Sequence, residues 1–178
     1  MRRILSVLML LMATTLIANP ASAQHPHVRE GFWINLGLGY GSLGCDNCDT
    51  REGAMSGQFG IGGTLSQKVI IGLMTNGWTK SEGGVTLTVG TAVAGIRFYP
   101  SATGGFFLTG GIGLGSISAD FAGFGSESET GTGVLIGLGW DFRVGRNVSL
   151  TPFWNGYAVS NDQADANVGQ IGLSVTVH

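Results

Sequence analysis

The sequence predicts an all-β fold: an eight-stranded antiparallel up-and-down transmembrane β-barrel that follows a cleaved signal peptide. Three observations support this. Apolar residues alternate with small or polar residues in eight short stretches, glycine makes up 32 of the 178 residues, and charged residues make up only 11%. Beyond the N-terminal leader, no stretch reaches the roughly 18 consecutive apolar residues that a membrane helix needs. A closed barrel is the remaining way to satisfy backbone hydrogen bonds inside a membrane.

The N-terminus has the three parts of a secretory signal peptide. A basic start at residues 2–3 precedes an apolar run from Ile4 to Ile17, and Ala21-Ser22-Ala23 matches a cleavage site of the A-x-A type. An uncleaved membrane anchor is the alternative, but the apolar run is short for a membrane helix. We therefore expect residues 1–23 to be removed.

The mature chain has room for a single domain. We expect a short periplasmic segment over residues 24–31 and the outer-membrane barrel domain over residues 32–178. Without the leader the chain holds 7 basic and 11 acidic residues. This mildly acidic balance argues against nucleic acid as a partner, because binding to phosphates requires a basic surface.

The first predicted strand, residues 32–41, shows the pattern most clearly. Large apolar side chains occupy one face, and the other face carries Trp33, Asn35 and three glycines. A period of two is strand geometry, and in a membrane barrel the large apolar set faces lipid while the small or polar set faces the interior. The other strands are predicted over residues 55–65, 69–78, 85–99, 106–115, 133–144, 148–159 and 170–177.

The alternation fixes the facing of most strands. In the fourth strand it groups Val89 and Val93 with the large apolar, outward set. The facing of Arg97 in that strand is left undetermined, because strict alternation turns its side chain outward whereas a bulge at Gly95 would turn it inward. The pattern leaves the phase of the seventh strand undetermined. In the eighth strand, the outward set is Ile171, Leu173, Val175 and Val177.

The connections alternate in length, as barrel topology requires. Those at residues 65–68, 99–105 and 145–147 are short, which is typical of the periplasmic side, and those at 42–51, 80–84, 119–129 and 160–165 are longer, which is typical of the cell surface. We expect aromatic girdles at the two membrane interfaces, formed by Trp33, Tyr99 and Phe106 on the inner side and by Tyr40 and Trp78 on the outer side.

The leader, the eight alternating stretches and the final apolar alternation resemble the small outer-membrane β-barrel superfamily, which includes the transmembrane domain of outer-membrane protein A and outer-membrane protein X. The resemblance covers essentially the whole mature chain and rests on a pattern, not on a diagnostic motif. It implies an outer-membrane location, contact with outer-membrane lipid, insertion by the barrel assembly machinery and a monomer. Such barrels usually end in an aromatic residue, whereas this sequence ends in Val177-His178.

Two groups of residues are candidates for a chemical role. Cys45 and Cys48 are the only cysteines, and in one surface loop of an exported protein we predict that they form a disulfide. A metal or redox site is the alternative, but it would need more ligands or a thioredoxin-like context. Asp141 and Arg143 are predicted to face the barrel interior, either as an internal ion pair that helps to plug the lumen or as a gate. Plugging is favoured because an eight-stranded interior is just wide enough to be filled by side chains.

The inward face is unusually rich in glycine, including Gly39, Gly62, Gly72 and Gly113. We favour tight curvature of a narrow barrel as the reason. The alternative is that the missing side chains leave space for water or a small ligand.

Several functional classes compete for such a barrel. An enzyme is disfavoured because His25, His27 and His178 are all predicted at the periplasmic ends, away from any surface serine. We therefore expect a non-enzymatic integral outer-membrane protein without cofactor or metal, with a structural or surface-interaction role through its extracellular loops. A narrow passive channel is the first alternative, although aqueous channels need about 16 strands. A soluble small-ligand-binding barrel is the second.

Overall fold

The computed structural model describes residues 29–45, 50–121, 123, 125–161 and 165–178, and every regular element in these ranges is a β-strand. The all-β fold class is confirmed. The predicted signal peptide and most of the predicted periplasmic segment lie outside the described residues. Among the residues that are described, no helix is long and apolar enough to cross a membrane. The strands are β1 (Phe32–Cys45), β2 (Glu52–Ser66), β3 (Val69–Glu82), β4 (Val85–Phe98), β5 (Phe106–Phe121), β6 (Gly125–Trp140), β7 (Phe142–Arg143), β8 (Val148–Ser160) and β9 (Asp165–Val177).

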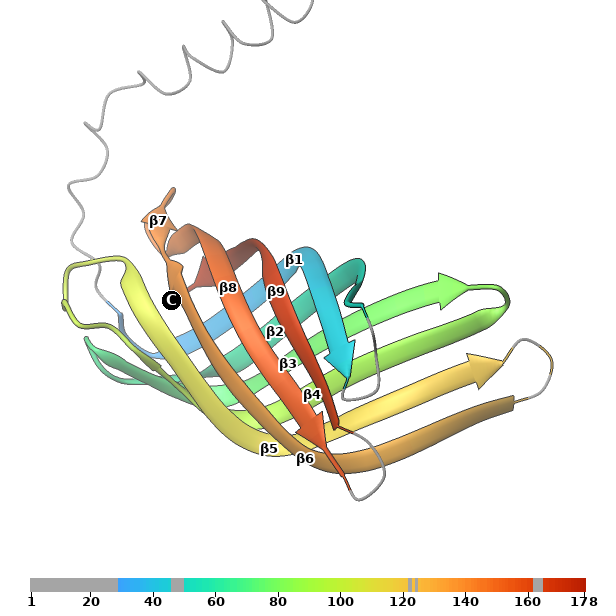
Figure 1. The fold of residues 1–178 in the computed structure, drawn as a ribbon. Coiled ribbons are helices and arrows are strands. Elements are labelled where there is room, and N and C mark those ends of the chain that lie inside the picture. Colours follow the sequence, from blue (N-terminus) through green and yellow to red (C-terminus); the bar gives the residue numbers. More distant parts are fainter. Residues whose placement is uncertain (1–28, 46–49, 122, 124, 162–164) are drawn as a thin grey trace, which may run out of the picture.

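The strands form one closed antiparallel barrel with neighbours in chain order (Figure 1). β1 pairs with both β2 and β9, and the barrel closes where β6 pairs with β8. β6 and the short β7 are two parts of one barrel strand, interrupted at Asp141, because both pair with β8. The nine strands therefore occupy eight positions in the barrel wall, as the sequence predicts.

The strand registers fix the tilt and width of the barrel. Following paired residues once around the wall from Val69 on β3 leads back to β3 at Thr79, ten residues further along. The residues on this path are Val69, Phe98, Leu108, Leu138, Trp154, Ile171, Tyr40, Met55 and Thr79. With eight strands and a stagger of ten residues, the strands tilt by about 40° and the backbone radius is about 8 Å. So narrow a barrel leaves an interior that side chains can fill.

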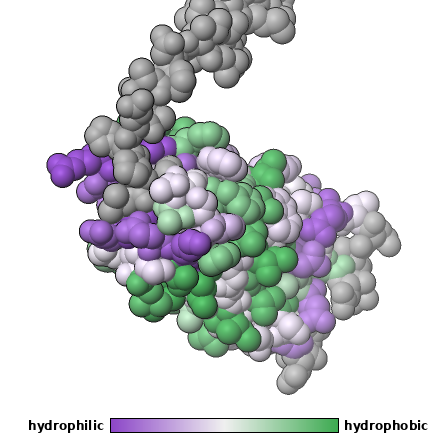
Figure 2. Space-filling model, turned by 90° about the vertical axis from the view of Figure 1, so that its left-hand side faces the viewer, coloured by the Kyte–Doolittle hydropathy of each residue, from purple (hydrophilic) through white to green (hydrophobic). Residues whose placement is uncertain are grey.

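The outer surface is apolar in the middle and polar at both ends. Large apolar side chains point outward around the wall, with Leu38 67% exposed and Ile112 65% exposed. Figure 2 shows this hydrophobic band between two hydrophilic rims. An apolar exterior contradicts the soluble-barrel alternative and fits a wall that faces lipid. The end with the short turns is assigned to the periplasm, and the opposite end to the cell exterior.

Two predictions about facing were wrong or incomplete. Val89 and Val93 on β4 are buried inside the barrel, and Arg97 shares their face and is also buried. The register of β3 with β4 is continuous, so Arg97 faces inward by plain alternation and not through a bulge at Gly95. On the seventh predicted strand, β8, the inward residues are Ser149, Thr151, Phe153, Asn155, Tyr157 and Val159.

The predicted aromatic girdles were also partly wrong. Trp33, Trp78 and Tyr99 are 1% exposed or less and fill the interior, whereas Tyr40 points outward. The reason is that the lumen of a closed barrel has to be packed, and these rings belong to the inward phase of their strands. On the outer wall near the periplasmic end, aromatic side chains are instead supplied by Phe32, Phe98, Trp140 and Phe142.

Two of the predicted surface loops are extended hairpins. β3 and β4 continue to Glu82 and Val85, joined by Gly83 and Gly84 at φ +60° and +84°. Two consecutive residues with positive φ are typical of a tight hairpin turn, which favours glycine. β5 and β6 remain paired as far as Phe121 and Gly125. In Figure 1 these two hairpins extend well beyond the ends of β1, β8 and β9.

Glycines lie in rows across neighbouring strands. Gly62 pairs with Gly72, Gly72 with Gly95, and Gly95 with Gly111. At the inward glycines there is no room for a side chain: a Cβ on Gly72 would lie 2.2 Å from the carbonyl oxygen of Ile61. The glycines thus allow the wall to bend sharply, which supports the curvature interpretation over a ligand cavity.

We expect Gly72→Ala to lower the free energy of unfolding by about 1–3 kcal/mol, because the new methyl group overlaps backbone atoms that cannot rotate away. Gly77→Ala is the matched control, since Gly77 is on the same strand and a Cβ there meets nothing within 4 Å. Urea unfolding in detergent, followed by the heat-dependent shift of the folded barrel on a gel, measures both. Equal stabilities of the two variants would contradict the steric argument.

Candidate functional site

The periplasmic end of the barrel interior holds a buried carboxylate. Asp141 accepts a hydrogen bond of 2.8 Å from the Tyr99 hydroxyl and one of 2.6 Å from the Thr151 hydroxyl. Nε2 of His178 lies 3.5 Å from the same Oδ2 that Tyr99 contacts. These partners come from the ends of β4, β8 and β9, so the carboxylate joins strands from several parts of the wall. The predicted inward facing of Asp141 is what brings them together.

Arg29 closes this end of the barrel. The side chain is 1% exposed, and its guanidinium carbon lies 3.5 Å from the centre of the Tyr99 ring. It donates hydrogen bonds to the backbone carbonyls of Gln67, Ala102 and Gly104, which belong to two different periplasmic turns. A residue of the predicted periplasmic segment therefore covers the mouth of the barrel. No sequence pattern identifies Arg29 for this role.

Arg97 lies deeper in the barrel interior than Arg29, and its guanidinium packs between aromatic rings. Its guanidinium carbon is 4.0 Å from the centre of the Phe107 ring and 4.6 Å from that of Trp33. Such cation–π contacts stabilise a cation that has left water.

Polar amides fill the middle of the barrel, and apolar side chains fill its extracellular half. Asn155 donates to Gln58 at 2.6 Å and to Asn76 at 3.0 Å. Above them pack Trp78, Val89, Tyr157, Val159, Val168 and Leu43. The cavity between the amides and Arg97 has a volume of about 10 Å³, room for about one water molecule. The described interior is filled, which disfavours the passive-channel alternative.

The remaining predicted site residues have mixed outcomes. Arg143 follows Asp141 on the same face and is half-buried; its role in an ion pair with Asp141 stays a prediction. Cys45 ends β1 and is not a free thiol, but Cys48 lies outside the described residues, so the pairing of the two also stays a prediction. His25 and His27 lie outside the described residues as well. In the described part of the chain, no group of three or more His, Cys, Asp and Glu residues is placed to hold a metal ion.

The extracellular end carries a projecting four-stranded sheet, formed by the ends of β3 to β6. Lys80 lies 2.7 Å from Glu52 and 2.6 Å from Glu82. The hydrogen bond to Glu52, and then that to Glu82, raises the pKa of Lys80, and Lys80 in turn lowers the pKa of Glu82. One face of this sheet is continuous with the inner face of the barrel. It carries the apolar residues Val85, Leu87, Ile117 and Phe121, followed on β6 by Glu127 and Glu129.

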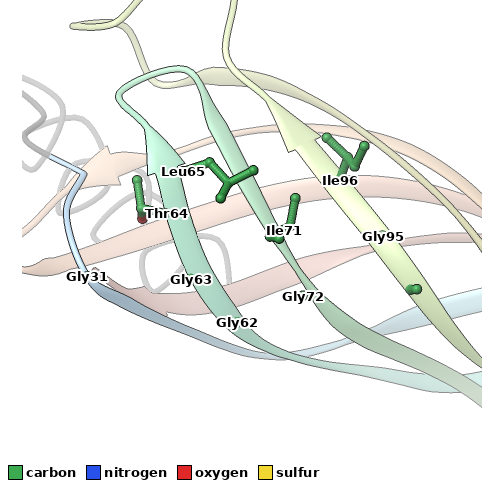
Figure 3. A pocket seen from close by; sticks show the side chains of 10 residues that line it. Gly31, Gly62, Gly63, Thr64, Leu65, Ile71, Gly72, Gly95 and Ile96 are labelled. Atoms are coloured by element: carbon green, nitrogen blue, oxygen red, sulfur yellow. The ribbon is translucent and has the colours of Figure 1, made fainter.

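The outer wall bears shallow apolar grooves where glycines replace larger side chains. One of them has a volume of about 710 Å³ and lies near the periplasmic end. Figure 3 shows the side chains of Leu65, Ile71 and Ile96 on neighbouring strands. Further along the same strands, the groove is lined by glycines, namely Gly62, Gly63, Gly72 and Gly95. No charged residue lines this groove. A second groove, of about 320 Å³, lies around Gly57 and Gly77 and is likewise uncharged.

A closed, filled, eight-position barrel with an apolar belt defines a small outer-membrane β-barrel protein. The chain belongs to the family described as outer membrane protein beta-barrel domain, whose model matches residues 8–178. This confirms the resemblance that the sequence pattern indicates and supports an outer-membrane location.

Solved structures of small outer-membrane barrels share the fold. Neisserial surface protein A has a TM-score of 0.69 at 13% identity, covering 85% of this chain and 99% of that chain. Ail of Yersinia pestis, the attachment invasion locus protein, has a TM-score of 0.56 at 14% identity, covering 84% and 99%. The N-terminal barrel domain of Pseudomonas aeruginosa OprF has a TM-score of 0.51 at 14% identity, also covering 84% and 99%. Comparison with curated protein sequences gives no match.

We expect Tyr99→Phe to lower the free energy of unfolding by about 1.5–3 kcal/mol, because it removes one donor from a buried charged acceptor. Tyr157→Phe is the control: Tyr157 is also buried in the interior, and its hydroxyl has no hydrogen-bond partner. Its removal is therefore expected to leave stability unchanged or slightly higher. Urea unfolding of both variants checks this, and a larger loss for Tyr157→Phe would refute the role given to Asp141.

Replacing both Asp141 and Arg143 by alanine is expected to destabilise the barrel without opening it. Tyr99 and Thr151 would each lose an acceptor, at about 1–3 kcal/mol per buried donor, while the aromatic and amide layers would still fill the lumen. Single-channel recording in planar bilayers, together with urea unfolding, separates the two interpretations. Altered conductance with unchanged stability would support a gate instead of a plug.

Proposed function

We propose that this protein is a non-enzymatic outer-membrane protein that binds a partner through its projecting extracellular sheet. The observation that carries the proposal is the edge of β6. Its last pair with β8 is Thr132 with Ser160, and among the described residues no strand pairs with the outer side of residues 125–130. An exposed strand edge presents backbone donors and acceptors to another chain.

The chemistry of this edge favours a basic partner strand. Glu127 and Glu129 are exposed and lie on one face of β6, two residues apart. A strand added beside them would place every second side chain opposite a glutamate, and opposite charges at paired positions stabilise a sheet. Val85, Ile117 and Phe121 on the same face of the sheet offer apolar contact. The partner expected here is an extended segment that alternates basic and apolar residues.

The charge distinguishes this surface from one that binds a polyanion. Ail of Yersinia pestis, which shares the fold, has been crystallised with the heparin analogue sucrose octasulfate. The described extracellular strand ends of this chain carry more acidic than basic residues, namely Glu52, Glu82, Asp120, Glu127, Glu129 and Asp165 against Arg51 and Lys80. We therefore propose a surface-interaction role with the opposite charge preference.

The filled interior supports a role outside the barrel instead of passage through it. A structural contribution to the envelope is the second candidate, favoured by the dense packing of the lumen and by the clamp of Arg29 across two turns. It would require no specific binding at the β6 edge.

A defined peptide tests the proposal. A peptide that alternates lysine and valine over seven residues is expected to bind the folded barrel in detergent, and an alternating glutamate–valine peptide is not. The double variant Glu127→Gln/Glu129→Gln is expected to weaken binding several-fold, at about 0.2–1 kcal/mol for each cross-strand pair. Fluorescence anisotropy of the labelled peptide measures both.

The matched control is Ser126→Ala/Ser128→Ala, which changes the opposite face of the same edge and is expected to leave binding unchanged. Equal binding of the acidic and basic peptides would argue against the proposed partner. So would equal binding by the glutamate variant and the parent protein, leaving the structural role in first place.

A further inference from the structure

A third groove on the outer wall differs from the two uncharged ones because a cation lies at its end. It has a volume of about 350 Å³ and is formed by outward residues of β6, β8 and β9. Val134 and Ile136 form one side. Small residues, Ala158 and Gly169, form the open part of the floor. Arg51, which directly precedes β2, is the charged residue that lines the groove.

The groove runs from the middle of the apolar belt toward the extracellular boundary. Successive outward cross-strand pairs of β8 and β9 are Trp154 with Ile171, Gly156 with Gly169, Ala158 with Asn167, and Ser160 with Asp165. The wall therefore changes from large apolar to small and then to polar side chains. A Cβ on Gly156 would lie 3.2 Å from the Trp154 ring, so the indole lies against the floor at the membrane end.

The guanidinium of Arg51 is fixed at the polar end of the groove. It donates to Asn167 Oδ1 at 2.8 Å, to Ser42 Oγ at 3.0 Å and to the Ser42 carbonyl at 2.5 Å. These bonds to described residues use three of its five N–H donors, and two N–H groups are not engaged by the described part of the chain. Among the described residues, no carboxylate lies within ion-pair distance of Arg51. The hydrogen bonds hold its positive charge in place at the end of the groove.

We propose that this groove binds a phosphate-bearing lipid of the outer leaflet, with an acyl chain along Ala158 and Gly169 and the phosphate on Arg51. The groove is apolar inside the membrane and cationic at the membrane boundary. This arrangement matches a lipid whose acyl chain lies in the membrane and whose phosphate lies at its surface. Arginine pairs well with phosphate because its planar donors match the phosphate oxygens. Inside a bilayer, apolar contact alone gives little selectivity, because bulk lipid tails are equally apolar. Selectivity therefore comes from Arg51, and the groove supplies a fitted surface for the chain.

The test compares dipalmitoyl phosphatidic acid with dipalmitoylglycerol, which has the same chains but no phosphate. Native mass spectrometry of the folded full-length barrel, released from detergent with each lipid, measures the bound fraction. We expect one phosphatidic acid to be retained more strongly than the diacylglycerol. Arg51→Gln should weaken this retention about ten-fold, as the loss of one charge-assisted contact implies, and abolish the difference between the two lipids.

Gly169→Leu fills the groove and is expected to weaken retention of phosphatidic acid with Arg51 still present. The backbone tolerates this change, since a Cβ on Gly169 meets nothing within 4 Å. Gly77→Leu is the matched control, because a Cβ there is equally free but Gly77 lines an uncharged groove. The heat-dependent gel shift verifies that each variant is folded.

Two results would overturn the proposal: equal retention of the two lipids by the parent protein, or equal loss of phosphatidic acid in Gly169→Leu and Gly77→Leu. If Gly169→Leu does not fold, the comparison of the two lipids in the parent protein and in Arg51→Gln still decides. The β6 edge is not involved in this site, so neither result bears on the peptide-binding proposal.

Discussion

Closure of the hydrogen-bonded wall is the constraint on which the rest of this structure depends. Within a membrane each backbone N–H and C=O has to find a partner in the protein, and a sheet achieves this only when its first and last strands pair. Eight positions with a stagger of ten residues give one tilt and one radius of about 8 Å. The tilt, the width and the volume of the interior then follow, whatever side chains the strands carry.

The narrow radius accounts for both the glycines and the packed lumen. At several inward positions a Cβ atom would collide with a carbonyl of the next strand, and glycines occupy them, namely Gly39, Gly62, Gly72 and Gly113. Elsewhere the inward side chains are long enough to meet across the barrel, as Asn155 does with Gln58 and Asn76. A filled interior moves any binding role to the surfaces, which are the extracellular sheet and the lipid-facing wall.

The fold could be predicted because strand alternation, glycine content and the leader all indicate one class. The sequence was less informative where both faces of a strand are apolar. In β4, Val89 and Val93 are as hydrophobic as the lipid-facing residues of other strands, yet they face inward because the extracellular half of the lumen is itself apolar. Arg97 could have resolved this facing. A cation within the membrane layer is expected to face the barrel interior, and Val89 and Val93 lie on the same face of β4 as Arg97. Tyr99 and Trp78 were misassigned for a related reason, since aromatic residues suit a membrane interface and a packed lumen equally well.

Other features depend on contacts between residues far apart in the chain. The clamp of Arg29 requires two turns, at Gln67 and at Ala102–Gly104, to lie side by side, which only the closed barrel arranges. The inward facing of Asp141 follows from alternation, but its partners Tyr99, Thr151 and His178 come from three separate strand ends. The length of the hairpins was underestimated because polar, glycine-rich strands that leave the membrane have the composition of loops.

The tight turn at Gly83 and Gly84 has a practical consequence for studying this protein on living cells. It lies at the tip of a hairpin whose strands stay paired to the last residue, and it is far from Asp141, Arg29 and the strand ends that close the barrel. The described residues Arg29 and His178 lie at the opposite end of the barrel, beside Asp141 and the short turns. An epitope inserted between these two glycines would be displayed outward at the end of a paired hairpin, which makes the turn a suitable position for antibody labelling of intact cells.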